Sequence, residues 1–291
     1  MPKDFSGENP VPAATLQATT LPGRGALPDL IKGHMRWVKD PASGRRADFS
    51  RMDLASLDLS GINLSGAILV ATNCQGVRLS GANLSNADLF AADLTDADLS
   101  SANLTSASLR GAKLSGAKLD HANLTEADLR GGTVMGADGM RLGSETTDIS
   151  DCQLDFATLA RARMSGAQLR RTSLFGAKLS GAQLNGADLD ETNFANADLS
   201  GANLAGARAS NASFRNANLR DANLTGVSAS KSHFEGADFE GSEMAESSLI
   251  DCWLEKAKVL INPNNLPAYL RRVFTEHEQW VVTGGKKGQR G

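Results

Sequence analysis

Apolar residues recur every five positions through most of this 291-residue chain. In the stretch "GANLSNADLFAADLTDADLSSANLTSASLR", residues 81–110, an alanine, a polar residue and a leucine are followed by two small or polar residues, and the unit then repeats. The central apolar residue keeps this phase from Phe49 to Leu254, a run of about 42 units. So long a run in one phase identifies the chain as a repeat protein.

A period of five fits neither of the common elements. On an α-helix five residues turn the side chain through about 500°, so the leucines would spiral around the helix instead of forming a stripe. On a flat strand an odd spacing would place successive leucines on opposite faces. The backbone must therefore bend once per unit, with the central residue and the alanine two positions before it pointing inward. Coils of this kind are stabilised only by stacking on their neighbours, so the pattern predicts a solenoid.

Three phenylalanines indicate how many units complete one coil. Phe194, Phe214 and Phe234 follow one another at an interval of four units, so their rings would stack in one column if four units form a turn. At the usual spacing of about 4.8 Å between neighbouring strands, 42 units would give about ten coils and a rod of roughly 50 Å.

The repeated unit resembles that of the pentapeptide-repeat proteins, whose motif is a small residue, Asp or Asn, Leu or Phe, Ser or Thr, and Gly or another small residue. The resemblance covers about 210 residues. It implies an all-β solenoid, a right-handed quadrilateral parallel β-helix with four pentapeptides per coil. It also implies a class of partner, because family members that confer quinolone resistance resemble B-form DNA in width and charge and bind DNA gyrase.

The repeat weakens in the segment "MGADGMRLGSETTD", residues 135–148, where the central positions hold Gly139 and Ser144. We expect a disordered coil or a protruding loop here. The regular coil should resume at Ile149 and Leu154. The β-helix as a whole is predicted to span residues 46–259, with this irregular stretch inside it.

The two ends of a stacked solenoid expose unpaired backbone and must be covered. Residues 27–45 are predicted to form an N-terminal capping helix and a lead-in to the rod, because Pro28 can begin a helix and apolar residues follow at helical spacing. Residues 1–26, rich in Pro, Gly, Ala and Thr, are predicted to be a flexible tail.

Residues 260–291 are predicted to form a C-terminal amphipathic helix followed by a basic tail. Its passage His277-x-x-Trp280 repeats His34-x-x-Trp37 of the N-terminal lead-in. The second copy could be a C-terminal cap recruited from a duplicated lead-in, a dimerisation helix, or the remnant of a second module. Our main hypothesis includes a homodimer joined through this helix. The apolar stripe assigned to the cap or dimer contact contains Leu266, Leu270, Val273, Phe274 and Trp280.

Composition supports a core built from leucine and small residues, since hydrophobic residues make up 41% of the chain but aromatic residues only 5%. We see no apolar run long enough for a signal peptide or a membrane span, so we expect a cytoplasmic protein without membrane contact. The three cysteines occupy inward positions, and Cys152 and Cys252 should lie about five coils apart, beyond disulfide reach. This spacing fits a reducing compartment.

The sequence contains no recognisable catalytic set. The four histidines are scattered, no pair has the spacing of a metal site, and no Ser-His-Asp or Cys-His arrangement is suggested. We therefore expect a protein that is not an enzyme and that holds no cofactor or metal. An enzyme that uses the loop at 135–148 is a third and minor hypothesis.

The outward charged residues of the predicted rod fall into columns. Asp58, Arg78, Asp98 and Lys118 begin a column that continues, at the same interval of four units, through residues 138 and 158 to Lys178 and Asp198, so opposite charges should pair on neighbouring coils. A second column is predicted to be an acidic face that a partner contacts. This candidate face consists of Asp48, Asp88, Asp128, Asp148 and Asp188.

Two functions compete. The main hypothesis is a non-enzymatic scaffold, a rigid and mildly acidic rod that binds an unidentified protein and has no direct contact with nucleic acid. The alternative is a DNA mimic that modulates DNA gyrase or another DNA-binding protein. Against the mimic stand the modest acidity of the rod and a basic cluster in its middle. That cluster comprises Arg161, Arg163, Arg170 and Arg171.

Overall fold

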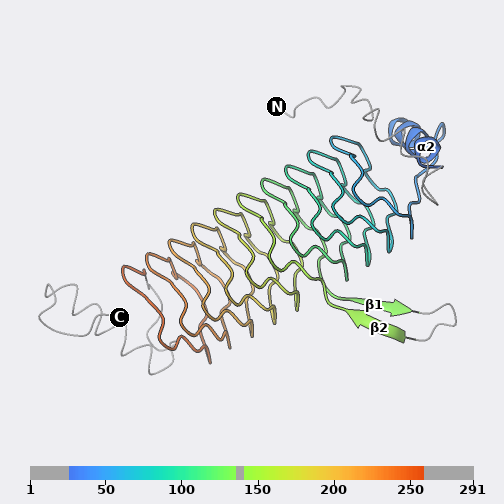
Figure 1. Cartoon of the computed structure of the whole chain (residues 1–291). Helices are drawn as coiled ribbons and strands as arrows, with labels where there is room; N and C mark the ends of the chain where they lie inside the picture. The colour runs from blue at the N-terminus through green and yellow to red at the C-terminus, as the bar shows by residue number, and fades with distance from the viewer. Residues whose placement is uncertain (1–25, 136–140, 259–291) are drawn as a thin grey trace, which may run out of the picture.

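The computed structural model describes residues 26–135 and 141–258, and in this part of the chain the backbone winds into a rod of stacked coils (Figure 1). Its regular elements are helix α2 (Leu27–Lys39) and strands β1 (Gly132–Met135) and β2 (Arg141–Glu145). The coils themselves contain no long strands in the described part of the chain. Each is a succession of tight turns and single β-bridges.

Parallel bridges between residues four pentapeptides apart hold neighbouring coils together. Four columns of bridges run along the rod, so four pentapeptides make one coil, in agreement with the spacing of the phenylalanines. We call the columns face 1 (Asp48 to Glu243), face 2 (Asp53 to Ser248), face 3 (Asp58 to Trp253) and face 4 (Asn63 to Lys258).

Each pentapeptide bends because it contains a β-turn, as the first unit shows. The Met52 N–H donates to the Phe49 carbonyl at 3.0 Å, which closes the turn. Arg51, the third residue of that turn, has a φ of 61°, the left-handed conformation that a type II turn requires at this position. The Phe49 N–H donates to the Ile68 carbonyl of the next coil at 2.7 Å. One unit therefore supplies both a corner and a rung of the ladder.

The core lies inside the coils and consists of the central residues and the small residues two positions before them. Nearly all of these side chains are almost completely buried. The phenylalanine column forms as the sequence predicts: the rings of Phe194 and Phe214 have centroids 5.0 Å apart, and those of Phe214 and Phe234 are 4.8 Å apart.

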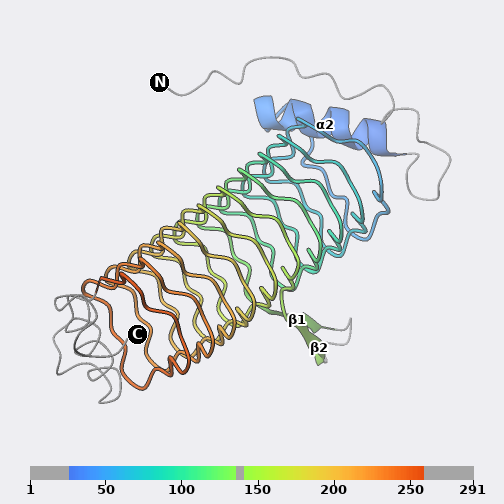
Figure 2. The same ribbon diagram turned by 60° about the vertical axis from the view of Figure 1, so that its left-hand side comes forward.

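A hairpin formed by the antiparallel pair β1 and β2 leaves the rod between faces 1 and 2 and projects from its side (Figures 1 and 2). Lys113 bridges Asp93 on the preceding coil at the usual interval, but on the following coil it bridges Asp148, three units further along the chain than expected. The segment 132–146, equal in length to three pentapeptides, is therefore looped out of the ladder. The irregular stretch expected at 135–148 is thus a protruding hairpin, and it begins at Gly132.

Thr147 closes the gap that the hairpin leaves. Its buried side chain takes the inward position that alanine fills in other units. The Thr147 hydroxyl donates to the Arg130 carbonyl at 2.8 Å and accepts a hydrogen bond from the Gly111 N–H at 2.9 Å. The coil therefore continues across the point where the chain departs and returns.

Helix α2 lies across the first coil (Figure 2). Leu27 and Ile31 join the core of the rod, and His34 is fully buried. The His34 Nδ1 accepts a hydrogen bond from the Ala47 N–H at 3.1 Å, and the imidazole stacks on Trp37 with centroids 5.4 Å apart. Burial, reinforced by the nearby positive charge of Arg46, lowers the pKa of His34. The lead-in histidine is therefore a neutral acceptor that joins the helix to the rod.

The predicted C-terminal helix falls outside the described residues. Its stripe from Leu266 to Trp280 stays a prediction.

Candidate functional site

The outward residue before each central leucine has a structural task. The Asp48 carboxylate accepts a hydrogen bond from the N–H of Ser50, two residues later, at 2.9 Å. Such Asx interactions stabilise turns, which explains why Asp and Asn interchange at this position along the repeat. The same bond forms in the other members of the candidate acidic face, at 2.9 to 3.2 Å: Asp88, Asp128, Asp148 and Asp188.

The prediction that these five aspartates share one face is wrong. Asp48, Asp88 and Asp128 lie on face 1, whereas Asp148 and Asp188 lie on face 2. An unbroken repeat would place all five in one column, but the hairpin removes three units from the coil. Because a whole number of units is removed, the period of five survives while every later residue moves to the next face.

The predicted charge column is divided by the same shift. Its first four members, from Asp58 to Lys118, share face 3, but Lys178 and Asp198 lie on face 4. The Arg78 guanidinium pairs with Asp58 at 2.5 Å on the neighbouring coil. This hydrogen bond, together with those that the hydroxyl and the N–H of Ser60 donate, lowers the pKa of Asp58 to about 2.

The mid-rod arginines, predicted to form a basic cluster, are paired with acids. Arg161 contacts Glu126 at 2.7 Å, across neighbouring coils. Because each guanidinium lies beside a carboxylate, the middle of the rod presents alternating charges rather than a basic patch. The remaining pairs are Arg171 with Asp151 (2.7 Å), Arg163 with Asp128 (3.5 Å), and Arg170 with Asp188 and Asp190 (3.5 Å each).

Exposed aromatic residues are the feature that sequence reasoning missed. Among the described residues, the exposed large hydrophobic side chains are Phe156 (50% exposed), Ile250 and Trp253. Phe156 stacks on His121, with centroids 5.4 Å apart and planes 9° apart, and meets Phe175 edge-on at 5.5 Å. The sequence did contain one sign of this feature: Phe156 occupies a turn position that glycine, serine or asparagine fills in most units.

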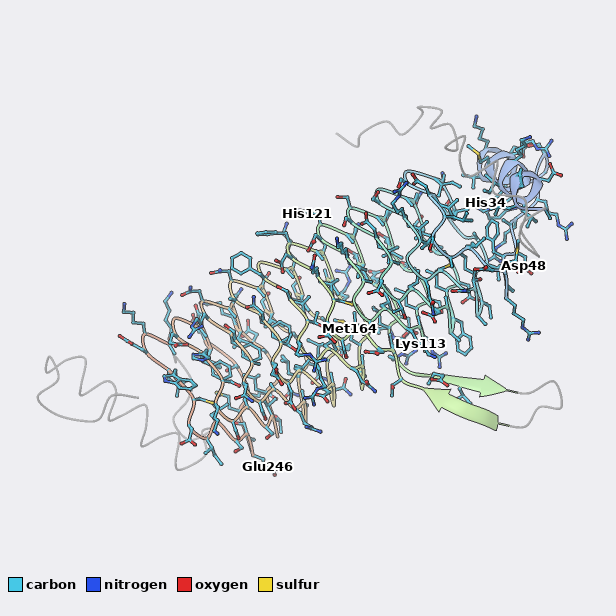
Figure 3. The ribbon with its side chains drawn as sticks, viewed as in Figure 1. His34, Asp48, Lys113, His121, Met164 and Glu246 are labelled. Atoms are coloured by element: carbon cyan, nitrogen blue, oxygen red, sulfur yellow. The ribbon has the colours of Figure 1, made fainter. Side chains whose placement is uncertain are left out.

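This aromatic group lies at the corner between faces 3 and 4, whereas the hairpin leaves from the corner between faces 1 and 2. Figure 3 shows His121 on the side of the rod away from the hairpin. The two most distinctive outward features of the rod therefore occupy opposite corners.

The cysteines are inward and poorly ionised. Burial raises the pKa of Cys74 and of Cys152 to about 12, which leaves little thiolate for nucleophilic chemistry. Within residues 26–135 and 141–258, no group of three His, Cys, Asp or Glu side chains could hold a metal ion. The same residues include no helix with the length and apolarity needed to cross a bilayer.

Two family models match the chain. One, described as pentapeptide repeats, matches residues 45–69, 67–105, 92–131 and 152–190, and the other, described as a pentapeptide repeat region, matches residues 177–254. The matches leave out residues 132–151, which contain the hairpin. No curated protein sequence matches the chain.

Solved structures of similar proteins include HetL, a pentapeptide-repeat protein involved in the regulation of heterocyst differentiation in the cyanobacterium Nostoc sp. strain PCC 7120. It is 26% identical, and the alignment covers 76% of this chain and 94% of HetL, with a TM-score of 0.37. A pentapeptide-repeat protein of the Arabidopsis thaliana thylakoid lumen is 30% identical over 40% of this chain and 68% of its own, with a TM-score of 0.28. QnrB1, a plasmid-mediated fluoroquinolone resistance protein, is 17% identical over 68% of this chain and 91% of its own, with a TM-score of 0.31.

Proposed function

The chain belongs to the pentapeptide-repeat family, and from this premise we propose that it is a non-enzymatic scaffold, a rigid rod that binds a protein partner. Proteins of this family fold as right-handed quadrilateral β-helices, and their inward residues pack in the core of the stacked coils. Recognition must then come from outward residues and from segments that leave the coil.

The observation that carries the proposal is the β1–β2 hairpin. The rod does not use these residues for stacking, since the bridges and Thr147 restore the ladder across the gap. β1 and β2 pair with each other and extend away from the coils (Figure 1). A projecting hairpin with strand edges that the rod leaves unpaired is suited to contact another protein.

The surface charges favour this function over DNA mimicry. A mimic needs continuous negative faces, but the candidate aspartates divide between two faces and the mid-rod arginines neutralise their neighbours. We expect purified protein, titrated into the micromolar range with and without added salt, to leave DNA gyrase supercoiling unchanged. Inhibition that weakens with salt would instead favour the mimic and identify gyrase as the partner.

Deleting residues 132–146 tests the scaffold directly, because joining Gly131 to Thr147 restores four regular units to the interrupted coil. The deletion variant should keep the far-ultraviolet circular dichroism and the melting temperature of the wild type. We expect wild-type protein and a control variant, Lys256→Ser on the last coil, to capture the same protein from an extract of the source cells. The deletion variant should capture much less of it.

Two outcomes would contradict the proposal. One is that wild-type protein binds no protein in repeated captures with cross-linking. The other is a measured turnover that depends on an outward residue.

We also propose that two rods pair through residues 266–281, a segment outside the described part of the chain. Light scattering should give twice the mass of one chain for the wild type. Phe274→Asp or Trp280→Asp should give the mass of one chain. A wild type that is monomeric at all concentrations would contradict the pairing.

A further inference from the structure

We propose that the corner carrying Phe156 is a docking site for an arginine side chain of a partner protein. The inference rests on the proposed scaffold function, and it adds a site and the chemistry of the group that binds there. We define the aromatic corner by its five residues, which lie on three successive coils: Asp120, His121, Asp155, Phe156 and Phe175.

The exposure of Phe156 is the first argument. Its φ of 58° is the conformation that the turns of the rod require at this position, as at Arg51 and His121, so the fold accounts for the backbone. Exposing half of a phenylalanine ring to water is unfavourable, however. Stacking of the coils does not require a ring here, because the equivalent position of the next coil is Gly176 and that of the coil after it is Asn196.

The ring of Phe156 is held in place by its neighbours. His121 stacks on it from the preceding coil, and the Phe175 ring meets it edge-on. Gly176 leaves the space that the ring needs, because a Cβ there would lie 2.7 Å from Phe156 Cε1. An exposed aromatic side chain that is fixed before binding loses little conformational entropy on contact, which is typical of residues that dominate binding energy at interfaces.

Two carboxylates give the corner its charge preference. The Asp120 Oδ1 accepts the N–H of Asp155 at 2.9 Å, and the Asp155 Oδ1 accepts the N–H of Phe175 at 3.1 Å and the Ser173 hydroxyl at 2.5 Å. In the part of the chain that the structure describes, no ion pair reaches either carboxylate, whereas Asp151 on an adjacent corner has Arg171 at 2.7 Å. Each aspartate therefore keeps its other oxygen available for a cation from outside.

Arginine fits this combination best. Its guanidinium is planar and weakly hydrated, stacks against aromatic rings and donates several hydrogen bonds to carboxylates in the same plane. Lysine offers a more strongly hydrated point charge, and a purely apolar side chain would cover the second oxygen of each carboxylate without donating a hydrogen bond to it. The site therefore selects arginine over lysine, and a cation over a neutral group.

A phage-displayed library of random dodecapeptides, selected on the full-length protein, provides the probe. We expect arginine to be enriched several-fold in the selected peptides. The enrichment should disappear on Phe156→Ser and on the double variant Asp120→Asn/Asp155→Asn. Asparagine keeps the Oδ1 acceptor, so the double variant retains the internal hydrogen bonds. The control is Trp253→Ser, which removes the other large exposed aromatic ring of the described residues and should leave the selection unchanged.

Several results would overturn the inference: the same peptides selected on Phe156→Ser, equal enrichment of lysine and arginine, or enrichment of apolar peptides without arginine. The partner captured in the hairpin experiment separates the two proposals. If that partner binds Phe156→Ser as tightly as wild type but fails to bind the deletion variant, the arginine site is wrong and the scaffold function stands. If no protein binds the rod at all, the scaffold function is wrong, and the site fails with it because no partner presents the arginine.

Discussion

The coils before the hairpin, residues 47–131, and those after it, residues 147–258, share one backbone geometry but differ in their cores. Before the hairpin the central residue is leucine except at Phe49 and Cys74. After the hairpin the central positions also contain isoleucine, methionine, phenylalanine and alanine. Bridges and turns therefore define the coil, while the size of individual core side chains varies within it.

In two of the later coils a small core residue offsets a large one. Phe214 on face 3 follows Ala209 on face 2 of the same coil, and Phe234 follows Ala229 one coil later. In these two coils a large ring is accompanied by a small residue on the adjoining side, which keeps the interior filled without overpacking, whereas Phe194 follows Leu189. In the earlier coils four leucines achieve the same result.

The surfaces of the two regions differ as well. Before the hairpin Arg78 is paired with Asp58, and most aspartates are bonded to their own turns. After the hairpin several arginines contact an acid on a neighbouring coil, including Arg161, Arg171, Arg208, Arg215 and Arg220. The formal net charge is the same in both regions, −4, from 10 acidic and 6 basic residues before the hairpin and 15 and 11 after it, so the two surfaces differ in how their charges pair and not in net charge.

The largest expected effect comes from Phe214→Ala. Truncating a buried phenylalanine costs about 3–5 kcal/mol of unfolding free energy, and here it also interrupts the ring stack. Leu119→Ala, on face 3 before the hairpin, is the matched variant and should cost about 2–4 kcal/mol. Hydrogen exchange of the amides in the two coils measures both values. An equal loss in the two would show that the aromatic stack adds nothing.

Ala209→Leu tests volume compensation. The larger side chain should overpack its coil and cost about 1–3 kcal/mol. Adding Phe214→Leu should recover most of this loss, since the double variant recreates the four-leucine coil of the earlier half. A residual of about 1 kcal/mol should remain from the lost ring stack. Strictly additive losses in urea unfolding would rule out compensation between the two sites.

Acidification should loosen the N-terminal helix. The folded-state pKa of His34 is lowered from the ordinary value of 6.5, so the neutral form is favoured in the fold. Its contribution to stability is complete above pH 6.5 and declines as the pH falls below that value, because the unfolded state then binds the proton first. The protection factor of the Ala47 amide, its exchange rate compared with that of an unstructured amide at the same pH, should therefore fall below this pH. In His34→Asn, whose Oδ1 can accept the same hydrogen bond, the protection factor should show no such fall.

The smallest effect is expected for the surface ion pairs. Arg171→Gln should lower the unfolding free energy by about 0.2–1 kcal/mol, because both partners of the Arg171–Asp151 pair are largely exposed. High salt should reduce the difference between variant and wild type. Arg51→Gln on the first coil, where the described residues provide no ion pair for this side chain, is the control and should be neutral. An Arg171→Gln effect that is insensitive to salt would contradict an electrostatic origin.

The sequence was sufficient to predict the coil, since an inward residue, most often leucine, recurs every five positions and the phenylalanine spacing gives four units per turn. It was also sufficient for helix α2, because Pro28 and the apolar spacing are local signals. The assignment of residues to faces failed after Gly131. A looped-out segment of three whole units leaves the period of five unchanged, so the sequence pattern alone cannot reveal the shift.

The aromatic corner was missed for a different reason. The turn position that holds Phe156 accepts many residue types, so a phenylalanine there is not an obvious exception in the sequence. Phe156 forms an aromatic group because its ring stacks on His121. His121 lies before the hairpin in the chain, and the two rings are on neighbouring coils only because the hairpin segment is looped out. Contacts of this kind can be recognised only in the folded structure.

Thr147 has a consequence for engineering. Because its hydrogen bonds to Arg130 and Gly111 join the two ends of the hairpin at the rod, the coils beyond it are positioned by the ladder and not by the length of the insert. A binding loop or an epitope of another length could replace residues 132–146 without rotating any downstream face. The rod thus contains a natural grafting point, at which a foreign sequence would be displayed at a fixed distance from both ends.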